Sequence, residues 1–499
     1  MKSIAPLARV ILLMVAAWAT SYAQSIEDAL RIALPPQTIN ARSSGMGNAF
    51  IGVADDFSAL FWNPAGLGLL RESEFSVGLT NLSVTNDASF LGSKTSFDDG
   101  TTHINHIGLA LPFPVSRGSF VLAAGYNRLT NFLGVLRTEG FNPYSSIQRS
   151  LYNMNEDYDL AWKLGLEDTL VLTLQETGQP GWLAIPINRN VYQVQEVFES
   201  GNLGQWSFGG SIEFAPNFLA GLALNILTGS YRYDRTFIET DPNGFHQNTI
   251  VGDGGAPGRV AERTDFKSLE LRQTVAQDIS GYSLKFGMMY SLGSYARLGL
   301  SIQSPNSVTI SEDYSNSGES RFANSISSYS APTVKSEYDV TTGWVFGFGV
   351  SASPLAWLRF SGDLELADPS RIEISNTNVI GLTNLNSDIK RKLRSTNNFR
   401  VGAEVRVPTT DLFLRGGYGI SFSPWKEDPS SFDAKTISAG AGYLFDERVM
   451  LNAAFCLTSY SSFRLIYPDP DTENVPDSLL RIDEKIHRTA VVVSLGYRF

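Results

Sequence analysis

Few residues of this chain have the types and spacing that catalysis or metal binding requires. Asp55 and Asp56 are adjacent carboxylates, but one such pair supplies too few ligands for calcium. His103 and His106 stand three residues apart at the start of an expected strand, so their side chains tend toward opposite faces and suit neither a shared ion nor a catalytic triad. We therefore expect no enzyme, no metal site and no cofactor. The two aspartates are expected to form a solvated turn or salt bridges to arginines.

The bulk composition excludes further classes of function. The 499 residues contain one cysteine, Cys456, so no internal disulfide can form, and a net charge of −11 makes nucleic acid an unsuitable partner. Residues 467–478 are rich in acidic side chains but lack EF-hand spacing, which favours a solvated loop over a calcium site. No Walker-type loop is present to suggest ATP-driven work.

The first residues have the pattern of an export signal. Lys2 and Arg9 supply positive charge, residues 10–19 are apolar, and residues 21–23 (SYA) form a small-x-small cleavage site. We therefore predict that residues 1–23 are a signal peptide and that the mature chain starts at Gln24. No run of about 18 apolar residues follows, so the sequence predicts no transmembrane helix.

Alternation of apolar with small or polar residues is the dominant signal in the rest of the chain. At the C-terminal end, Val491, Val493, Leu495, Tyr497 and Phe499 share one face, opposite small and polar residues. Segments of this kind number about fourteen, and single-chain outer-membrane barrels have an even number of strands. The predicted strands are 72–84, 103–113, 118–136, 205–215, 218–238, 268–291, 295–314, 334–352, 356–376, 396–407, 411–424, 434–446, 448–466 and 485–499.

The connections between these segments alternate between short and long, which predicts a barrel. Short turns at one rim and long loops at the other are typical of an outer-membrane barrel, whereas a multi-domain β protein has no reason to alternate in this way. We predict an all-β fold, a transmembrane antiparallel β-barrel of about 14 strands formed by residues 71–499, in the outer membrane of a Gram-negative envelope. The long connections are 85–102, 137–204 (the longest), 239–267, 315–333, 377–395 and 467–484.

Charged residues on the inward faces of the predicted strands are expected to form a network that lines the lumen. A membrane barrel turns its apolar face to lipid and its charged and glycine-rich face to the lumen. The expected members are Arg359, Asp363, Glu365, Arg400, Glu404 and Arg406.

Residues 24–70 precede the first predicted strand and differ from it in composition. Their glycine-rich backbone cannot lie in lipid, because its polar groups would be unpaired there. A fourteen-strand barrel is also too wide for wall side chains alone to fill. We therefore predict that residues 24–70 form a hatch inside the lumen. Its candidate gating residues are Gly45, Met46, Gly47, Phe50, Asp55, Asp56, Phe61, Trp62, Asn63, Pro64 and Ala65.

Residues 41–67 (ARSSGMGNAFIGVADDFSALFWNPAGL) resemble the N-terminal hatch of the FadL/TodX family of outer-membrane long-chain fatty acid and hydrocarbon transporters. The matching pieces are residues 45–47 (GMG), 49–50 (AF), 54–56 (ADD) and 63–66 (NPAG). The resemblance implies a fourteen-strand barrel closed by a hatch and capture of a fatty acid or other hydrophobic small molecule at the extracellular loops. It also implies passage of the ligand through a side opening toward membrane lipid.

Two functions of different classes remain open at this point. The first is passive, ligand-gated transport of long-chain fatty acids or other hydrophobic small molecules across the outer membrane. The second is a FadL-like barrel that serves as a secretion-machinery shuttle or scaffold and binds protein partners instead of lipids. A general porin is disfavoured because it would keep an open aqueous pore without a hatch.

Two further features have both a functional and a structural interpretation. Apolar residues at helical spacing in the longest loop predict either an extracellular ligand groove or side chains that cap the barrel mouth. A possible bulge in the strand 118–136 predicts either a lateral opening or the point where the strand leaves the membrane. The groove residues are Leu160, Trp162, Leu164, Leu166 and Leu170, and the lateral-opening residues are Gly125, Asn127 and Arg128.

The C-terminal residue Phe499 follows an alternating apolar strand. This ending resembles the assembly signal of outer-membrane barrels. It predicts that the barrel assembly machinery is a partner of this chain.

Overall fold

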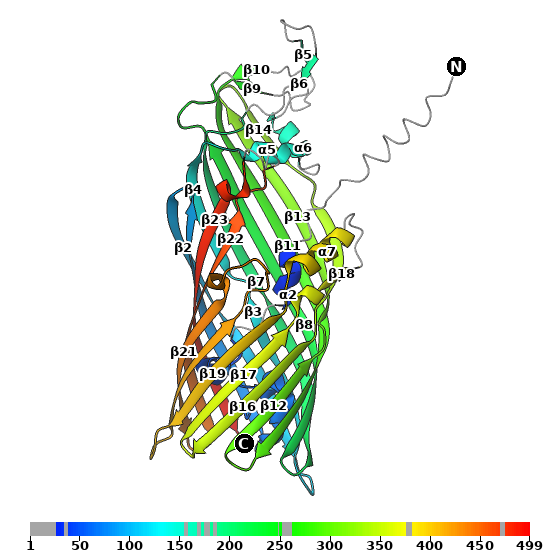
Figure 1. Cartoon of the computed structure of the whole chain (residues 1–499), viewed down its shortest axis with the longest axis vertical. Coiled ribbons are helices and arrows are strands. Elements are labelled where there is room, and N and C mark those ends of the chain that lie inside the picture. The colour runs from blue at the N-terminus through cyan, green and yellow to red at the C-terminus, as the bar shows by residue number, and fades with distance from the viewer. Residues whose placement is uncertain are drawn as a thin grey trace, which may run out of the picture.

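The computed structural model describes residues 26–33, 38–153, 158–166, 171–173, 180–182, 187–247, 249–251, 262–375, 382–469 and 475–499. These residues form a closed antiparallel barrel of fourteen strands (Figure 1), as the sequence predicts. No helix among them is long and apolar enough to span a membrane. The predicted signal peptide 1–23 and the groove residue Leu170 lie outside the described residues.

Four of the fourteen strands are interrupted, which gives eighteen strand segments, and the short strand β14 (Ile326–Ser330), paired with β13, is the nineteenth segment of the sheet. The last strand pairs with the first, from Glu74 opposite Arg498 to Ser89 opposite Asp483, and this pairing closes the barrel. In chain order the wall consists of β1 (Glu74–Phe90), β2 (Ser93–Phe113), β3 with β4 (Phe120–Asn131, Gly134–Asn142), β7 (Val191–Ala215), β8 (Phe218–Thr240), β11 (Phe266–Leu292), β12 with β13 (Ala296–Gln303, Ser307–Phe322), β15 with β16 (Val334–Thr341, Val345–Leu355), β17 with β18 (Leu358–Ala367, Glu373–Ser375), β19 (Thr396–Arg406), β20 (Leu412–Ser421), β21 (Ala434–Phe445), β22 (Val449–Leu465) and β23 (Arg481–Arg498).

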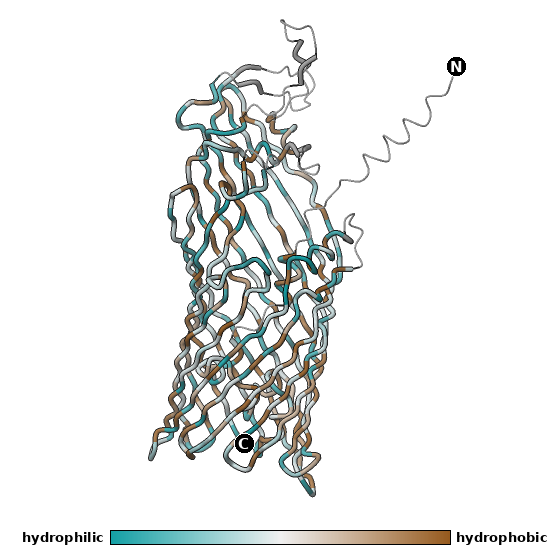
Figure 2. The backbone as a smooth tube through the Cα atoms, in the orientation of Figure 1, coloured by the Kyte–Doolittle hydropathy of each residue, from teal (hydrophilic) through white to brown (hydrophobic). Residues whose placement is uncertain are grey.

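The wall is apolar outside and polar inside, the reverse of a soluble sandwich. On β8, Leu222, Leu224 and Ile226 face outward and are exposed, while Ala223 and Asn225 between them are buried in the lumen. Apolar segments accordingly recur along the strands of the closed lower half of the barrel (Figure 2). An outward apolar band with polar side chains inside is the pattern of a membrane barrel.

The two rims differ in the length of their connections. At one end, which we call the turn rim, strands are joined by short connections such as residues 216–217 and 446–448. At the other end, the loop rim, several strands extend far beyond the apolar band, and the helices α5 (Ile147–Asn153), α6 (Tyr158–Lys163) and α7 (Leu382–Lys392) lie there (Figure 1).

Three predicted loops are wrong in their extent. In the predicted loop 315–333, β13 continues to Phe322 and a further short strand, β14, occupies Ile326–Ser330. Residues 85–102 are not a loop, because β1 and β2 continue through them and only Leu91 and Gly92 turn the chain. Most residues of this hairpin are polar, although Ala88 and Phe90 are buried in a hydrophobic core, so the apolar alternation that marks the other strands is weak here. The predicted loop 137–204 is shorter than expected, because β4 continues to Asn142 and β7 already begins at Val191.

Short elements occupy the lumen and the loop rim. We call residues 38–70 the luminal segment; it contains α3 (Ala41–Gly45), α4 (Ala59–Trp62) and the 3-10 helix η2 (Pro64–Leu69), and the helix α2 (Ile26–Ala33) lies above it. The luminal segment packs against inward wall residues in one hydrophobic core, and α2 packs against them in another. The remaining short elements are β5 (Val171–Thr173), β6 (Pro180–Trp182), β9 (Thr249–Val251), β10 (Glu262–Thr264), β14 (Ile326–Ser330), η3 (Pro369–Arg371), η4 (Ser430–Phe432) and η5 (Asp477–Leu479).

Candidate functional site

Asp55 is the centre of an ion-pair network that joins the luminal segment to the wall. Its carboxylate lies 2.6 Å from Arg42 of α3, 3.1 Å from Arg297 of β12 and 3.0 Å from Arg359 of β17. Glu404 of β19 pairs with the same Arg42 at 2.9 Å. Burial opposes the ionisation of Asp55, but Arg42, Arg359 and Arg297 outweigh it and hold the pKa of Asp55 well below its ordinary value. The salt bridges predicted for this aspartate are therefore present.

We expect Asp55→Asn to lower the free energy of unfolding by about 3 kcal/mol, the cost of removing one partner from a buried ion pair. Because the folded-state pKa of Asp55 is lowered, its contribution is fully present above the unfolded pKa of 3.8 and is lost as the pH falls through the folded-state value. Thermal unfolding in detergent should separate the two proteins at neutral pH and bring them together only in strong acid. A difference that persists unchanged to the lowest pH would contradict this origin.

Wall side chains also bond the backbone of the luminal segment. Asp363 of β17 accepts hydrogen bonds from the amides of Phe50 at 2.6 Å and Ile51 at 2.9 Å. Lys285 of β11 donates to the carbonyl of Phe61 at 2.7 Å. The side chain of Asn63 donates to the carbonyls of Ile51, within the segment, at 3.1 Å and of Met288, in the wall, at 3.0 Å. These bonds satisfy backbone groups that would otherwise be buried without partners.

Inward-facing glycines let the luminal segment approach the wall at van der Waals distance. A Cβ on Gly417 of β20 would lie 2.0 Å from the amide nitrogen of Gly47, and Gly47 itself has φ +64°, a conformation that favours glycine. The same close approach recurs around the barrel. The wall glycines whose Cβ would meet residues 45–64 are Gly108, Gly125, Gly209, Gly221, Gly287, Gly299, Gly347, Gly349, Gly402, Gly417, Gly419 and Gly440.

We expect Gly417→Ala to displace the luminal segment, at a cost of about 3 kcal/mol for overpacking against backbone. The neighbouring Gly416 is a matched control, since a Cβ there would meet nothing within 4 Å. Thermal unfolding should distinguish the two alanine variants, with Gly416→Ala close to wild type. Equal stability of both variants would show that the segment is not seated as described.

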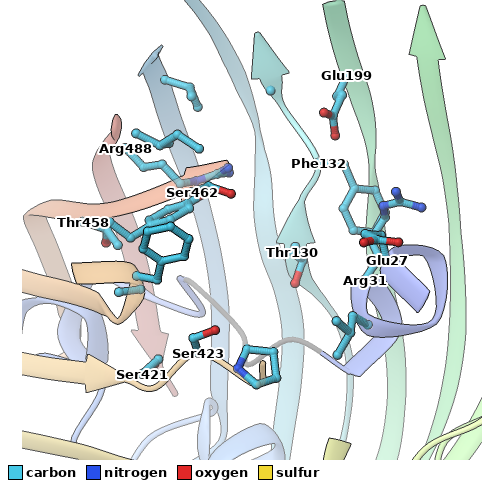
Figure 3. A pocket seen from close by; sticks show the side chains of 18 of the residues that line it. Glu27, Arg31, Thr130, Phe132, Glu199, Ser421, Ser423, Thr458, Ser462 and Arg488 are labelled. Carbon is cyan, nitrogen blue, oxygen red and sulfur yellow. The ribbon is translucent and has the colours of Figure 1, made fainter. Parts of the chain in front are cut away.

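A cavity of about 1700 Å³ lies in the lumen above the luminal segment. Gly47 and Asn48 line its floor, α2 contributes Glu27 and Arg31, and β23 contributes Arg488 (Figure 3). A second cavity of about 130 Å³ lies between α2 and the luminal segment and is lined by Phe61 and Trp62. Both cavities reach Leu129 and Thr130 at the end of β3.

The wall is interrupted beside the larger cavity. β2 and β3 pair only from Phe113 opposite Phe120 to His106 opposite Asn127. Beyond that point β2 pairs with β1 alone, and the rest of β3 and β4 pairs with β7 alone. A β-bulge in the β3–β7 ladder lies between Arg128 and Thr130. We call this interruption the wall break. The predicted bulge is therefore present, although Gly125 lies below the break and packs against Phe57.

Side chains from other strands hold the chain inward at the wall break. Arg488 of β23 donates to the carbonyls of Asn131 at 2.9 Å and Leu133 at 3.1 Å. Asn86 of β1 donates to the carbonyl of Val135 at 2.8 Å. These contacts replace the hydrogen bonds that β2 would supply if β3 continued straight. Arg488 was not a candidate from the sequence, although alternation along the last strand places it on the inward face.

Polar side chains line the wall break. Asn105 is fully buried and Asn127 is 1% exposed, and neither side-chain amide has a hydrogen-bond partner among the residues that the structure describes. Unpaired buried polar groups cost about 1–3 kcal/mol each. Arg128 lines the larger cavity and forms no ion pair with a carboxylate in the described part of the chain. The break is thus polar and locally unstable compared with the rest of the wall.

The predicted groove residues are largely buried at the loop rim. Leu160, Leu164 and Leu166 are 3%, 0% and 1% exposed. They pack in one hydrophobic core with Phe237 of β8 and Leu269 of β11, two long strands that extend to the loop rim. Trp162 is half-buried. We call α5, α6 and the strand ends around this core the cap. The arrangement observed is the capping alternative, not an exposed groove.

Phe499 is 58% exposed at the turn rim, and it exchanges backbone hydrogen bonds with Ser73 at 3.0 and 3.2 Å. Recognition by the assembly machinery stays a prediction. Among the residues that the structure describes, no group of three or more His, Cys, Asp or Glu side chains is placed to hold a metal ion.

Comparison with known proteins identifies the fold but not a sequence family. No protein-family model matches the sequence, and no curated protein matches it. The P. putida toluene transporter TodX superposes with a TM-score of 0.56 and 12% identity, over 93% of this chain and 99% of that one. A Pseudomonas aeruginosa FadL homologue gives 0.53 and 12%, over 93% and 99%. The monoaromatic hydrocarbon channel CymD gives 0.51 and 12%, over 92% and 97%. The chain therefore has the fold of the FadL/TodX-type barrels.

Proposed function

We propose that this chain is an outer-membrane channel that conducts hydrophobic small molecules, such as long-chain fatty acids or hydrocarbons, by passive diffusion. In barrels of this class, short turns face the periplasm and long loops face the exterior. The turn rim is then periplasmic and the loop rim extracellular. The luminal segment serves as the hatch predicted from the sequence, and the proposed ligand occupies the cavity above it.

The observation that carries this proposal is the wall break beside a cavity whose floor is closed. A ligand in the cavity cannot continue straight down, because residues 45–64 fill the bore against the wall glycines. The wall break at Asn127 and Arg128 supports a lateral route toward the membrane instead. A hydrophobic molecule that moves from the lumen to lipid by this route does not enter bulk water, so diffusion down its concentration gradient needs no energy source.

Membrane placement is supported by aromatic side chains near the periplasmic end of the apolar band. Phe214, Phe218 and Tyr290 form one contact chain, with ring centroids 4.7 and 5.8 Å apart, and Tyr443 contacts Phe445 at 4.6 Å. Aromatic girdles of this kind lie at the interfaces of membrane barrels. The described barrel therefore fits the outer membrane.

Uptake by cells that lack their own fatty acid channel tests the proposal. Expression of the chain should accelerate uptake of a fluorescent long-chain fatty acid or an aromatic hydrocarbon, and should leave uptake of a sugar of similar size unchanged. Faster sugar uptake would indicate a general pore. No acceleration of the hydrophobic probes, together with co-purification of an exported protein, would support the scaffold alternative.

A further inference from the structure

The barrel wall has two heights at its extracellular end. β7, β8 and β11 contain 25, 23 and 27 residues, whereas β19, β20 and β21 contain 11, 10 and 12. The pairing of β21 with β22 ends at Lys435 opposite Ser459, but β22 and β23 stay paired up to Leu465 opposite Arg481. From Ser459 to Leu465 this is about 20 Å of strand at roughly 3.3 Å per residue. No strand of the described chain pairs with this edge on the β21 side, but η4 packs against it, with the rings of Phe432 and Phe463 6.0 Å apart.

The large cavity reaches this edge. Its lining includes Tyr460 to Leu465 on the free edge of β22, residues 421–429 after β20, and Arg391 and Lys392 at the end of α7. Ser462 lies above Ser421 on one side of the open space, and Phe132 and Arg31 lie on the opposite side (Figure 3). We call this lateral boundary of the cavity the side mouth. Its lower edge is the end of β20 and β21, at Ser421 and Ala434.

The cap closes the alternative route from the tips of the loops. Its core contains Leu160, Leu164 and Leu166 from the loop and Phe237, Phe266 and Leu269 from the tall strands, each at most 3% exposed. A hydrophobic core of this kind is close-packed. A ligand that entered between the loop tips would have to disrupt it, whereas the side mouth already connects with the cavity.

The lower edge of the side mouth lies at the level of the outer leaflet. On β21, Ile437 faces outward and is 62% exposed, and the strand begins three residues earlier, at Ala434. That separation is about 10 Å along the strand. On β20, outward-facing Tyr418 is 41% exposed and lies opposite Ile437. On β8, in contrast, the strand continues from exposed Ile226 to Thr240, about 46 Å further.

The residues at the side mouth suit a molecule with an apolar chain and an acidic head. Phe422, Trp425 and Phe432 line it, and the exposed Lys392 and Lys426 lie at its edge. Lys392 pairs with Asp388 at 3.5 Å, and Glu427 and Asp428 also line the cavity. The basic lining residues outnumber these two carboxylates: Arg391, Lys392, Lys426 and Arg481. The chain around residue 425 is fixed, because the amide of Lys426 donates to the carbonyl of Lys392 at 2.9 Å. Basic side chains next to aromatic ones favour an anionic amphiphile at a membrane interface.

We propose that the ligand is an anionic amphiphile already embedded in the outer leaflet, and that it enters the cavity laterally through the side mouth above β20 and β21. This inference rests on the proposed function and specifies the route and source of its ligand. A hydrophobic chain then passes from lipid to the cavity without crossing bulk water, which removes the largest cost of its transfer.

Blocking the side mouth tests the route. Ser421→Cys and Ser462→Cys remove no side-chain hydrogen bond among the residues that the structure describes, and the native Cys456 is buried. A bulky methanethiosulfonate reagent on either cysteine is expected to reduce uptake of a fluorescent fatty acid to the level of cells without the channel, and reduction of the mixed disulfide should restore it. The matched control is Ser330→Cys on exposed β14 at the loop rim, where the same reagent should leave uptake unchanged.

Two outcomes would overturn the inference while the proposed function stands. The first is uptake that persists after modification of Ser421→Cys and Ser462→Cys, and the second is uptake that is lost only with Ser330→Cys. Absence of uptake before any modification would instead reject the proposed function. A photoactivatable fatty acid placed in the outer leaflet should label Trp425 or Phe432, and labelling confined to Trp162 of the cap would exclude the leaflet as the source.

Discussion

A disulfide across the wall break is expected to abolish uptake of hydrophobic ligands. His103 of β2 and Asn131 of β3 lie on opposite sides of the break, and their side chains approach to 3.4 Å between Asn131 Nδ2 and His103 Nδ1. The 3.4 Å contact joins the ends of two longer side chains, so in the double variant His103→Cys, Asn131→Cys the strands have to move closer before the two Sγ atoms can bond. The resulting disulfide links the strands where they no longer pair. A ligand in the cavity would lose its lateral route, while the luminal segment still closes the bore.

The readout is uptake of a fluorescent fatty acid before and after reduction. Oxidised protein should give background uptake, and reduction should restore it, which excludes misfolding as the cause. The two single cysteine variants are the controls, and both should transport under either condition. Normal uptake by the oxidised double variant, with the disulfide verified by mass spectrometry, would rule out the wall break as the route.

The barrel could be predicted from the sequence because its wall obeys a simple rule. Outward apolar residues such as Val491 and Val493 alternate with inward small or polar ones, and turn lengths distinguish the two rims. This alternation is expected only in the part of each strand that lies in the membrane. Residues 85–102 are mostly polar, so their pattern does not distinguish a tall hairpin from a loop, although the structure buries Ala88 and Phe90 in the core of the cap.

The sequence predicted that polar contacts join the luminal segment to the wall, but it did not predict which residues form them. Asp55 was expected to pair with inward arginines, and it pairs with Arg297 and Arg359. The role of Arg488 could not be foreseen, because it bonds residues 355 and 357 positions earlier, and only closure of the barrel brings them together.

Helical spacing of apolar residues in a loop does not determine which residues pack against them. Leu160 and Leu164 would have the same spacing on the wall of a ligand groove or in a core. The structure buries them against Phe237, which belongs to a strand extension that the sequence pattern did not connect with this loop. The cap, and with it the lateral position of the side mouth, follows from those tall strands.

Removal of the luminal segment is expected to convert a closed barrel into a conducting pore. In a variant that lacks residues 24–70, the bore of a fourteen-strand barrel would no longer be filled by residues 45–64. Ions would then pass from the side mouth through the cavity to the turn rim. We expect almost no conductance for the wild type in planar bilayers and a large, steady conductance for the deletion variant.

A second variant keeps this prediction testable if the deletion prevents assembly. Asp55→Asn combined with Gly417→Ala weakens the ion pairs and the packing of the segment without removing it, and Asp55→Asn with Gly416→Ala is its matched control. The double variant with Gly417→Ala should give intermittent openings. The control with Gly416→Ala should give fewer, because Gly417 contacts the segment and Gly416 does not. A correctly folded deletion variant that stayed closed to ions would mean that the cap, rather than residues 38–70, seals the barrel.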